Sequence, residues 1–253
     1  MKRAEFTKKL IKQIARTNVH FELLAPNDKV LVGLSGGKDS LTLVHALKHI
    51  QRVAPYEFSF KAVTISYGMG EDYSFLQRHC EEYGIEYEVY ETEIFDIAKE
   101  KIRQNSSYCS FFSRMRRGAL YTYALQNGFN KVALGHHLDD AIESFFMNML
   151  YNGTMRSMPP IYKTKKGLYV IRPLIEVREA QTRGFVERNN FVAIGDEMCP
   201  AMRFDIKEPY VRENMKAFIK DLERRFPDAV KYIRASFYHI HDDTFFDKGR
   251  LSI

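Results

Sequence analysis

The sequence predicts an α/β fold built around a doubly wound parallel sheet, with helical additions at both ends of the chain. Short apolar runs rich in Val, Leu and Ile alternate with longer stretches whose apolar residues recur every three or four positions. This alternation is typical of parallel sheets covered by helices. Two Gly-containing turns, residues 35–40 and 135–140, each follow an apolar run and precede a helical stretch. Since ligands of such sheets bind at the carboxyl ends of the strands, we expect both turns to face one crevice.

The individual elements follow from these periodicities in chain order. Residues 2–21 place apolar side chains at helical spacing among basic ones, which predicts a basic amphipathic helix. Strands are expected at 30–34, 58–65, 86–90, 131–135 and 169–171, and further helices at 41–47, 72–83, 112–127 and 139–150. Two or three basic helices are expected in the last third. The predicted parts are an N-terminal helix at 1–25, a central α/β domain at 26–195 and a helical extension at 196–253.

The composition fits a cytoplasmic enzyme. No apolar run approaches the ~18 residues of a membrane span, so no membrane partner is expected. The Lys-rich N-terminus lacks the apolar core of a signal peptide. Three cysteines without close pairing argue against a disulfide scaffold. The 38 basic and 32 acidic residues leave a net charge of +6, which permits nucleic-acid binding without demonstrating it.

The first turn has the features of an anion site. Its sequence is Ser35-Gly36-Gly37-Lys38-Asp39-Ser40. Paired glycines let the backbone approach a phosphate, and the amide N–H groups of a helix N-terminus point at it. The spacing fits neither the Walker A loop nor the dinucleotide-binding Gly-x-Gly-x-x-Gly pattern. Ser66, at the end of the next predicted strand, and Gly135 are expected to bind the same ligand.

The second turn combines histidines with carboxylates in Gly135-His136-His137-Leu138-Asp139-Asp140. Asp140 and Glu143 are three residues apart, so they share a helical face. Asp39 or Asp140 can hold Mg²⁺ on triphosphate oxygens, and His136 can contact the phosphates or the reacting base. Two alternatives stay open: acidic residues also cap helices, and both histidines with the acids can ligate zinc.

Five blocks carry a resemblance to a known family. The hexapeptide Ser35–Ser40 resembles the PP-loop of the ATP pyrophosphatases, which cleave ATP between its α and β phosphates. Together with four further blocks in the same order, it resembles the TtcA family of tRNA 2-thiocytidine synthetases over nearly the whole chain. These blocks are Cys109–Gly118, Leu134–Asp140, Met158–Pro160 and Ile171–Leu174.

The resemblance implies a fold of the adenine nucleotide α hydrolase type and an ATP- and Mg²⁺-dependent enzyme. Such an enzyme adenylates O2 of a cytidine in the tRNA anticodon loop, at tRNA position 32, and sulfur then displaces AMP. Family members hold a [4Fe–4S] cluster with three cysteines. A sulfur donor such as a cysteine desulfurase and a homodimer are the expected partners besides tRNA. The residues expected to act in catalysis are Cys109, Cys199, Asp140 and His136.

The chain departs from the family pattern at one cluster ligand. Cys109 and Cys199 match the first and third cysteines, but Phe112 stands at the second position. Three readings remain open: a cluster with a non-Cys third ligand, a persulfide and resolving-thiol pair, or a divergent paralogue with another nucleophile. Cys80 lies on a different predicted element and is interpreted as a buried apolar residue.

The expected tRNA contacts are arginines in two basic, nearly acid-free stretches. These arginines are Arg114, Arg116, Arg117 and Arg156. Phosphate contacts add salt-dependent affinity, although such charge runs are also common on solvated surfaces. Two other functions compete with tRNA thiolation. One is a PP-loop enzyme that acts on another tRNA base or a small molecule, and the other is a nucleotide-binding regulator without sulfur chemistry.

Overall fold

The computed structural model describes residues 2–101, 108–195, 211–246 and 249, with the side chains of 101 and 108–110 left out. The chain forms two compact units. The first comprises Met1–His137 and Pro159–Pro209, and the second comprises Leu138–Met158 and Tyr210–Ile253. Among the described residues, no helix combines the length and the apolar character needed to cross a membrane.

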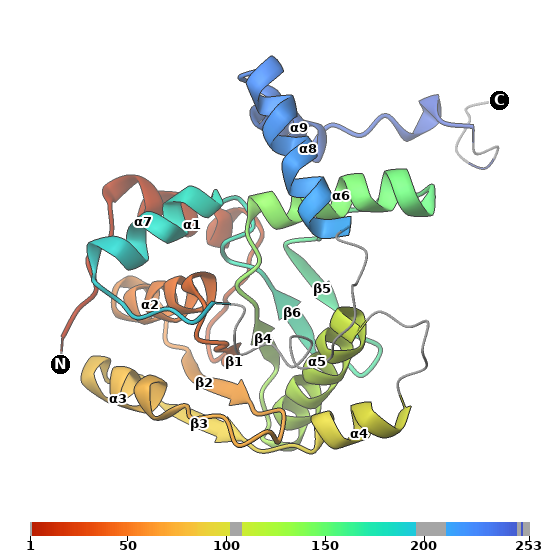
Figure 1. Ribbon diagram of the computed structural model, residues 1–253. Coiled ribbons are helices and arrows are strands. Elements are labelled where there is room, and N and C mark those ends of the chain that lie inside the picture. The colour runs from red at the N-terminus through yellow and green to blue at the C-terminus, as the bar shows by residue number, and fades with distance from the viewer. Residues whose placement is uncertain (1, 102–107, 196–210, 247–248, 250–253) are drawn as a thin grey trace. The chain divides into compact units, whose positions relative to one another are not determined.

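The first unit contains a six-stranded sheet in the order β3-β2-β1-β4-β6-β5 (Figure 1). All neighbours are parallel except β5 and β6. The doubly wound parallel sheet expected from the sequence is therefore confirmed, with one antiparallel edge strand added. The strands are β1 (Lys29–Gly33), β2 (Ser59–Ile65), β3 (Tyr87–Tyr90), β4 (Lys131–Ala133), β5 (Ile161–Lys163) and β6 (Tyr169–Ile171).

Helices cover both faces of this sheet. Successive side chains of a strand point to opposite faces. In β1, Val30 and Val32 accordingly join one core cluster and Leu31 joins another. The first cluster includes side chains of α1 (Lys8–His20), α2 (Lys38–Val53), α3 (Ser74–Tyr83) and α7 (Glu179–Arg188). The second includes side chains of α4 (Ile94–Lys101) and α5 (Tyr108–Gln126).

The strand order brings the two turns of interest together. The chain continues from β1 to β2 and β3 on one side, whereas β4 lies on the other side of β1. Such a change of direction is where doubly wound sheets bind ligands. The turn 35–40 follows β1, and residues 135–137 follow β4. Both segments therefore leave neighbouring parallel strands at the carboxyl edge of the sheet.

The second unit is helical. It contains α6 (Leu138–Asn152), α8 (Val211–Arg225), α9 (Ala229–Ser236) and the short 3₁₀-helix Asp242–Thr244. Its core consists of five buried side chains: Leu138, Ile142, Met215, Ile219 and Val230. The parts expected from the sequence divide the chain differently, because they assign residues 138–152 to the central domain. In the structure, these residues form α6, which shares its core with α8 and α9.

Candidate active site

The turn after β1 has a backbone shape that excludes side chains at its first glycine. Gly36 has a φ of 81°, which L-residues rarely adopt, and a Cβ there would collide with the side chain of Ile194. The amide of Ile194 donates to the carbonyl of Gly36 at 2.9 Å. The loop after α7 therefore fastens this turn from outside and requires glycine at position 36.

Hydrogen bonds within the turn fix the start of α2. The Ser40 hydroxyl donates to the carbonyl of Gly37 at 2.9 Å and accepts from the amide of Ser35 at 3.2 Å. Helix α2 begins at Lys38, with Gly37 as its N-cap. The first-turn amides of a helix have no intrahelical acceptor, and together with the helix dipole they bind anions. The turn thus presents an anion-binding helix terminus at the sheet edge.

Both charged side chains of the turn are held by α7. The ammonium of Lys38 lies 3.0 Å from Asp39 Oδ2 and 2.9 Å from Glu179 Oε1. The buried Thr182 hydroxyl donates to Asp39 Oδ1 at 2.6 Å. Burial alone would lower the pKa of Lys38, but the two carboxylates outweigh it and raise this pKa. Lys38 therefore stays charged at neutral pH, and Asp39 keeps a fixed orientation.

The second turn packs directly on the first. A Cβ on Gly135 would lie 3.1 Å from the backbone of Asp39 and Ser40, so this close approach favours glycine. The buried ring of His137 places Nε2 3.7 Å from Asp39 Oδ2. Residues 135–137 and the phosphate-type turn thus form one continuous polar surface in the first unit.

His136 is oriented by a buried arginine. Arg172 Nε donates to His136 Nδ1 at 3.3 Å, and Arg172 Nη1 donates to the carbonyl of Pro159 at 2.6 Å. Burial lowers the pKa of Arg172, and the neighbouring Tyr162 and Tyr121 act against that shift. Because Nδ1 accepts a hydrogen bond, His136 carries its proton on Nε2 in this arrangement.

Ser66 lies at the end of β2 and is buried. Its hydroxyl donates to Glu71 Oε2 at 3.2 Å and accepts from the amide of Gly68 at 3.2 Å. Burial alone would raise the pKa of Glu71, but amide and hydroxyl donors of this turn outweigh it and lower the pKa. Ser66 therefore shapes the turn after β2, and nucleotide binding by this residue stays a prediction.

Asp140 lies in the second unit, on the first turn of α6. Its side chain and that of Glu143 are buried, and both pair with Arg212 of α8. Arg212 Nε donates to Glu143 Oε2 at 2.9 Å, and its Nη2 donates to Asp140 Oδ1. One guanidinium therefore serves the two carboxylates expected to share a helical face. The role of Asp140 at magnesium stays a prediction.

The expected sulfur site lies mostly outside the described residues. This holds for Cys199 and for the side chain of Cys109, whose backbone belongs to α5. Phe112 is described: it is 2 % exposed, and its ring packs edge-on against Tyr67 and Phe111. A phenyl ring cannot ligate iron, so this position does not fit a three-cysteine cluster. Cys80 is buried, and burial raises its thiol pKa to about 12, as expected for a packing residue.

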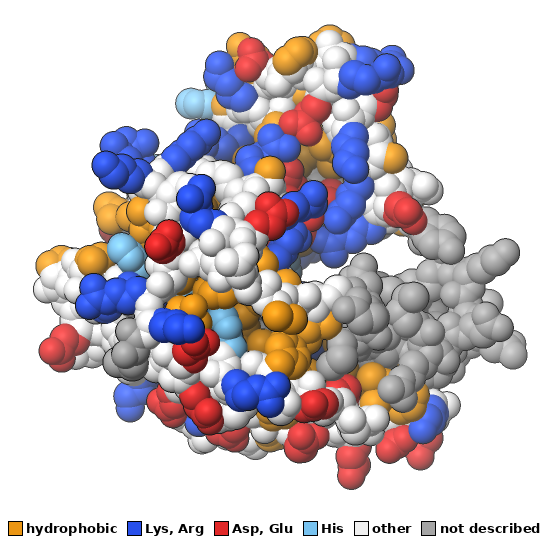
Figure 2. Space-filling view, turned by 60° about the vertical axis from the view of Figure 1, so that its left-hand side comes forward, with side chains coloured by type: hydrophobic (Ala, Val, Ile, Leu, Met, Phe, Trp, Pro, Cys, Tyr) orange, Lys and Arg blue, Asp and Glu red, His pale blue; other side chains and the backbone are white. Residues whose placement is uncertain are grey.

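Within the described part of the chain, no group of three or more His, Cys, Asp or Glu side chains could hold a metal ion. The zinc alternative with His136 and His137 therefore finds no support there. Arg114, Arg116 and Arg117 are exposed along α5, and Arg156 is exposed in the second unit. Lys and Arg side chains are spread over the face drawn in Figure 2, with acidic side chains along its lower edge. Contact of these arginines with tRNA stays a prediction.

Sequence reasoning missed the residues that hold the turn from α7 and beyond. Glu179, Thr182 and Ile194 lie about 140 to 160 positions after the residues they contact. No local pattern marks them. Arg172 could have been found, since it belongs to the recognised block Ile171–Leu174.

Comparison with known proteins assigns the family. Residues 4–216 match the PP-loop domain family. The tRNA-cytidine(32) 2-sulfurtransferase of Citrifermentans bemidjiense is 36% identical over 249 residues, covering 97% of this chain and 95% of that protein. The chain belongs to the tRNA-cytidine(32) 2-sulfurtransferase family of PP-loop proteins. Another member, from Geobacter metallireducens, is 40% identical over 227 residues, which is 88% of this chain and 86% of that protein.

A solved structure supports the fold of this family member. The U34-tRNA thiolase NcsA from Methanococcus maripaludis, with its [4Fe-4S] cluster, superimposes with a TM-score of 0.74. It shares 24% sequence identity, and the match covers 92% of this chain and 78% of that protein. The resemblance and the PP-loop fold expected from the sequence are both confirmed.

Proposed function

We propose that this protein is an ATP-dependent tRNA sulfurtransferase that converts cytidine 32 to 2-thiocytidine. The observation that carries the proposal is the turn 35–40 beside residues 135–137 at the sheet edge, in a chain that matches enzymes of this name over 97% of its length. ATP pyrophosphatase chemistry needs a phosphate cradle, a cation and an oriented carboxylate, which the turn, Lys38 and Asp39 can supply.

The first chemical step is adenylation of the tRNA base. The cytidine O2 attacks the α-phosphorus of ATP, and pyrophosphate leaves with its bonding electron pair. The amides of residues 36–40 would bind the phosphates, and Lys38 would exchange its contact with Glu179 for a phosphate oxygen. Asp39, oriented by Thr182, would hold Mg²⁺, which neutralises charge on the triphosphate when bound.

Asp140 and His136 complete the proposed chemistry. Asp140 would add a second carboxylate toward magnesium. His136, whose Nε2 carries the proton, would donate to a phosphate or to the activated base. Both assignments rest on the motif 134–140 and on the family, since Asp140 is described only within its own unit.

Sulfur transfer is the second step. A thiolate-derived sulfur attacks C2 of the adenylated cytidine, and AMP leaves with the former O2. Cys109 and Cys199 are the proposed carriers, and a cysteine desulfurase is the proposed class of donor. Because Phe112 does not fit a three-cysteine cluster, we route no step through iron and favour the thiol pair. The cytoplasm is the proposed location, and self-association of the chain belongs to the same proposal.

The experiment that tests the proposal measures ATP cleavage with defined transcripts. Purified protein, ATP, Mg²⁺ and a tRNA with cytidine at position 32 should give AMP and pyrophosphate. The same tRNA with uridine at position 32 is the control and should leave only background turnover. ADP and phosphate as products would contradict the PP-loop chemistry. Equal turnover with both transcripts would contradict the substrate.

A second measurement tests the proposed tRNA contacts. Replacing Arg114, Arg116 and Arg117 by Ala should lower the log–log salt slope of tRNA binding by about 2.7 at ~0.9 per duplex contact, or about 2 on single strands. The matched control replaces Lys8, Lys9 and Lys12, which are exposed on α1 and carry the same charge. An equal change in both triple variants would show a general charge effect and remove the arginines from the site.

A further inference from the structure

Helix α8 is apolar on a second face that its own unit leaves uncovered. Met215 and Ile219 are buried in the core of the second unit. Phe218, Leu222 and Phe226 form another stripe at intervals of four residues, which places them on a common face. Phe218 is 44% exposed and Phe226 is 61% exposed. A helix normally keeps the side opposite its core polar, so this second stripe is unexpected on an isolated surface.

Neighbouring helices extend the stripe into a continuous patch. The ring of Phe146 on α6 lies edge-on to Phe218 with centroids 5.3 Å apart. Leu150 follows Phe146 by one helical turn and is 56% exposed, and Tyr232 on α9 is 64% exposed. We call this surface the α8 patch. It consists of Phe146, Leu150, Phe218, Leu222, Phe226 and Tyr232.

Exposed apolar side chains are concentrated in the second unit as a whole. Among the described residues, 14 large apolar side chains are exposed, and the first unit contributes four of them: Val19, Val53, Leu125 and Val192. The other ten lie in the second unit, although it is the smaller one. A concentration of this kind marks an interaction surface, whereas single exposed apolar residues are ordinary.

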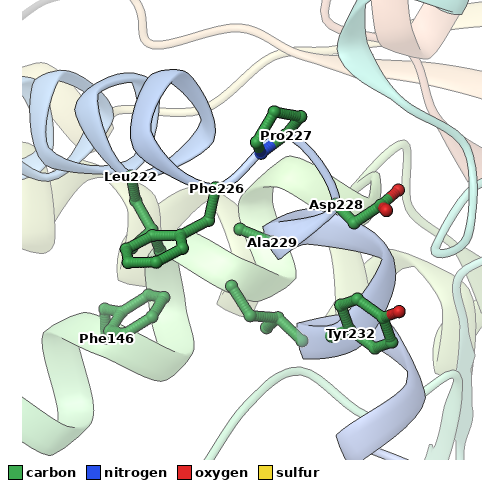
Figure 3. A pocket seen from close by; sticks show the side chains of 8 residues that line it. Phe146, Leu222, Phe226, Pro227, Asp228, Ala229 and Tyr232 are labelled. Atoms are coloured by element: carbon green, nitrogen blue, oxygen red, sulfur yellow. The ribbon is translucent and has the colours of Figure 1, made fainter.

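The α8 patch also contains a hollow. A groove of about 530 Å³ lies between the end of α8, α9 and α6, and Asp228 is its one acidic lining residue (Figure 3). Phe146, Leu222, Phe226 and Tyr232 line it. Phe226 and Tyr232 are also more than half exposed. The patch therefore offers both protruding rings and a hollow that can receive rings.

We infer that the α8 patch is the surface through which two copies of this chain associate about a two-fold axis. In such an isologous contact the same patch faces itself, so a ring of each copy can enter the groove of the other. At about 200 Å² per aromatic side chain, the exposed parts of the six residues supply on the order of 500 Å². A stable interface buries roughly 800 Å² per partner, and polar neighbours on the three helices supply the rim.

Charge favours a second copy over RNA as the occupant. The described residues of the second unit carry eight basic and nine acidic side chains, whereas the whole chain has a net charge of +6. Arg224 and Arg225, next to the patch, both pair with Asp221. A polyanion requires a basic surface. A self-interface only needs to avoid repulsion, and a balanced surface does so.

This inference adds a surface to the self-association included in the proposed function and rests on that part alone. Light scattering on the size-separated full chain tests it without ATP or tRNA. We expect the wild type at twice the chain mass of 29.6 kDa. The double variant Phe226→Glu/Tyr232→Glu should elute as a monomer. The control Val19→Glu, at a 75% exposed position of the first unit, should remain a dimer.

Two results would overturn the inference. One is a monomeric wild type at all concentrations, which would assign the patch to the chain's own tail or to a different protein. The other is a double variant that stays dimeric. If the double variant fails to fold, hydrogen exchange of the wild type decides: α8 and α9 should exchange more slowly in the dimer than after dilution, and equal exchange would overturn the interface. A monomer that thiolates tRNA would leave the proposed function standing, and an inactive dimer would do the reverse.

Discussion

The turn 35–40 and the first turns of α5 differ in how their side chains are satisfied. At the turn, Lys38 and Asp39 are held by polar partners on α7, and the amides of α2 point to the sheet edge. At α5, Phe112 is packed among apolar side chains in one of the two sheet-face cores. The first region is organised for an anion, whereas the second is closed by an aromatic ring where the family pattern has a cysteine. Nucleotide activation is therefore specified more completely by the described residues than sulfur delivery.

The largest expected effect concerns the apolar side of this comparison. Phe112→Ala should lower the free energy of unfolding by about 3–5 kcal/mol, since it removes a fully buried ring and leaves a cavity. ATP binding at the distant turn should persist in the folded fraction. Denaturant unfolding measures the loss, and Phe111→Ala is the control, because Phe111 is only partly buried. A cost below about 1 kcal/mol would mean that Phe112 is not a core residue.

The next effect concerns Lys38. Lys38→Ala should reduce the rate of pyrophosphate release about 10²–10³-fold, because it removes a fixed charge from the phosphates in the transition state. Lys48→Ala on the same helix is the matched control, since the Lys48 ammonium donates to the carbonyl of Gly84 at 2.6 Å, away from the turn. Turnover within twofold of the wild type would remove Lys38 from the site.

The smallest effect concerns the support from α7. Thr182→Val keeps the shape of the side chain but removes the donor to Asp39, and a hydrogen bond to a charged group contributes about 1.5–3 kcal/mol. We expect the Mg²⁺ concentration for half-maximal ATP cleavage to rise roughly tenfold, since 1.4 kcal/mol corresponds to a factor of ten. Thr182→Ser should restore the wild-type value. An unchanged magnesium requirement would make Thr182 a packing residue only.

Local patterns predicted most of the sheet. The apolar runs that became β1, β2, β3, β4 and β6 were found, as were both turns, because strands and Gly turns depend on neighbouring residues. The three-residue edge strand β5 was missed, since it is too short to show a period. The first helix was expected from residue 2 but begins at Lys8, where the Thr7 hydroxyl accepts from the amide of Leu10 at 3.2 Å.

Long-range partners could not be predicted. Glu179 and Thr182 come to Lys38 and Asp39 only because α7 packs on α2. The pairing of Arg212 with Asp140 and Glu143 likewise depends on α8 lying against α6. Such contacts join residues about 70 to 140 positions apart, and no single-sequence pattern encodes which helix faces will meet. The sequence thus indicated the residues that touch the ligand better than those that hold them in place.

Mass spectrometry of nucleosides tests the sulfurtransferase activity most directly. Transfer RNA incubated with the protein, ATP, Mg²⁺, a cysteine desulfurase and cysteine is digested and analysed for 2-thiocytidine. We expect the product with cytidine at position 32, and none with uridine there. It should also be absent with Lys38→Ala, Cys109→Ser or Cys199→Ser, while Cys80→Ser behaves as the wild type. ATP cleavage to AMP without any 2-thiocytidine, or thiolation that survives both Cys109→Ser and Cys199→Ser, would contradict the proposed sulfur transfer.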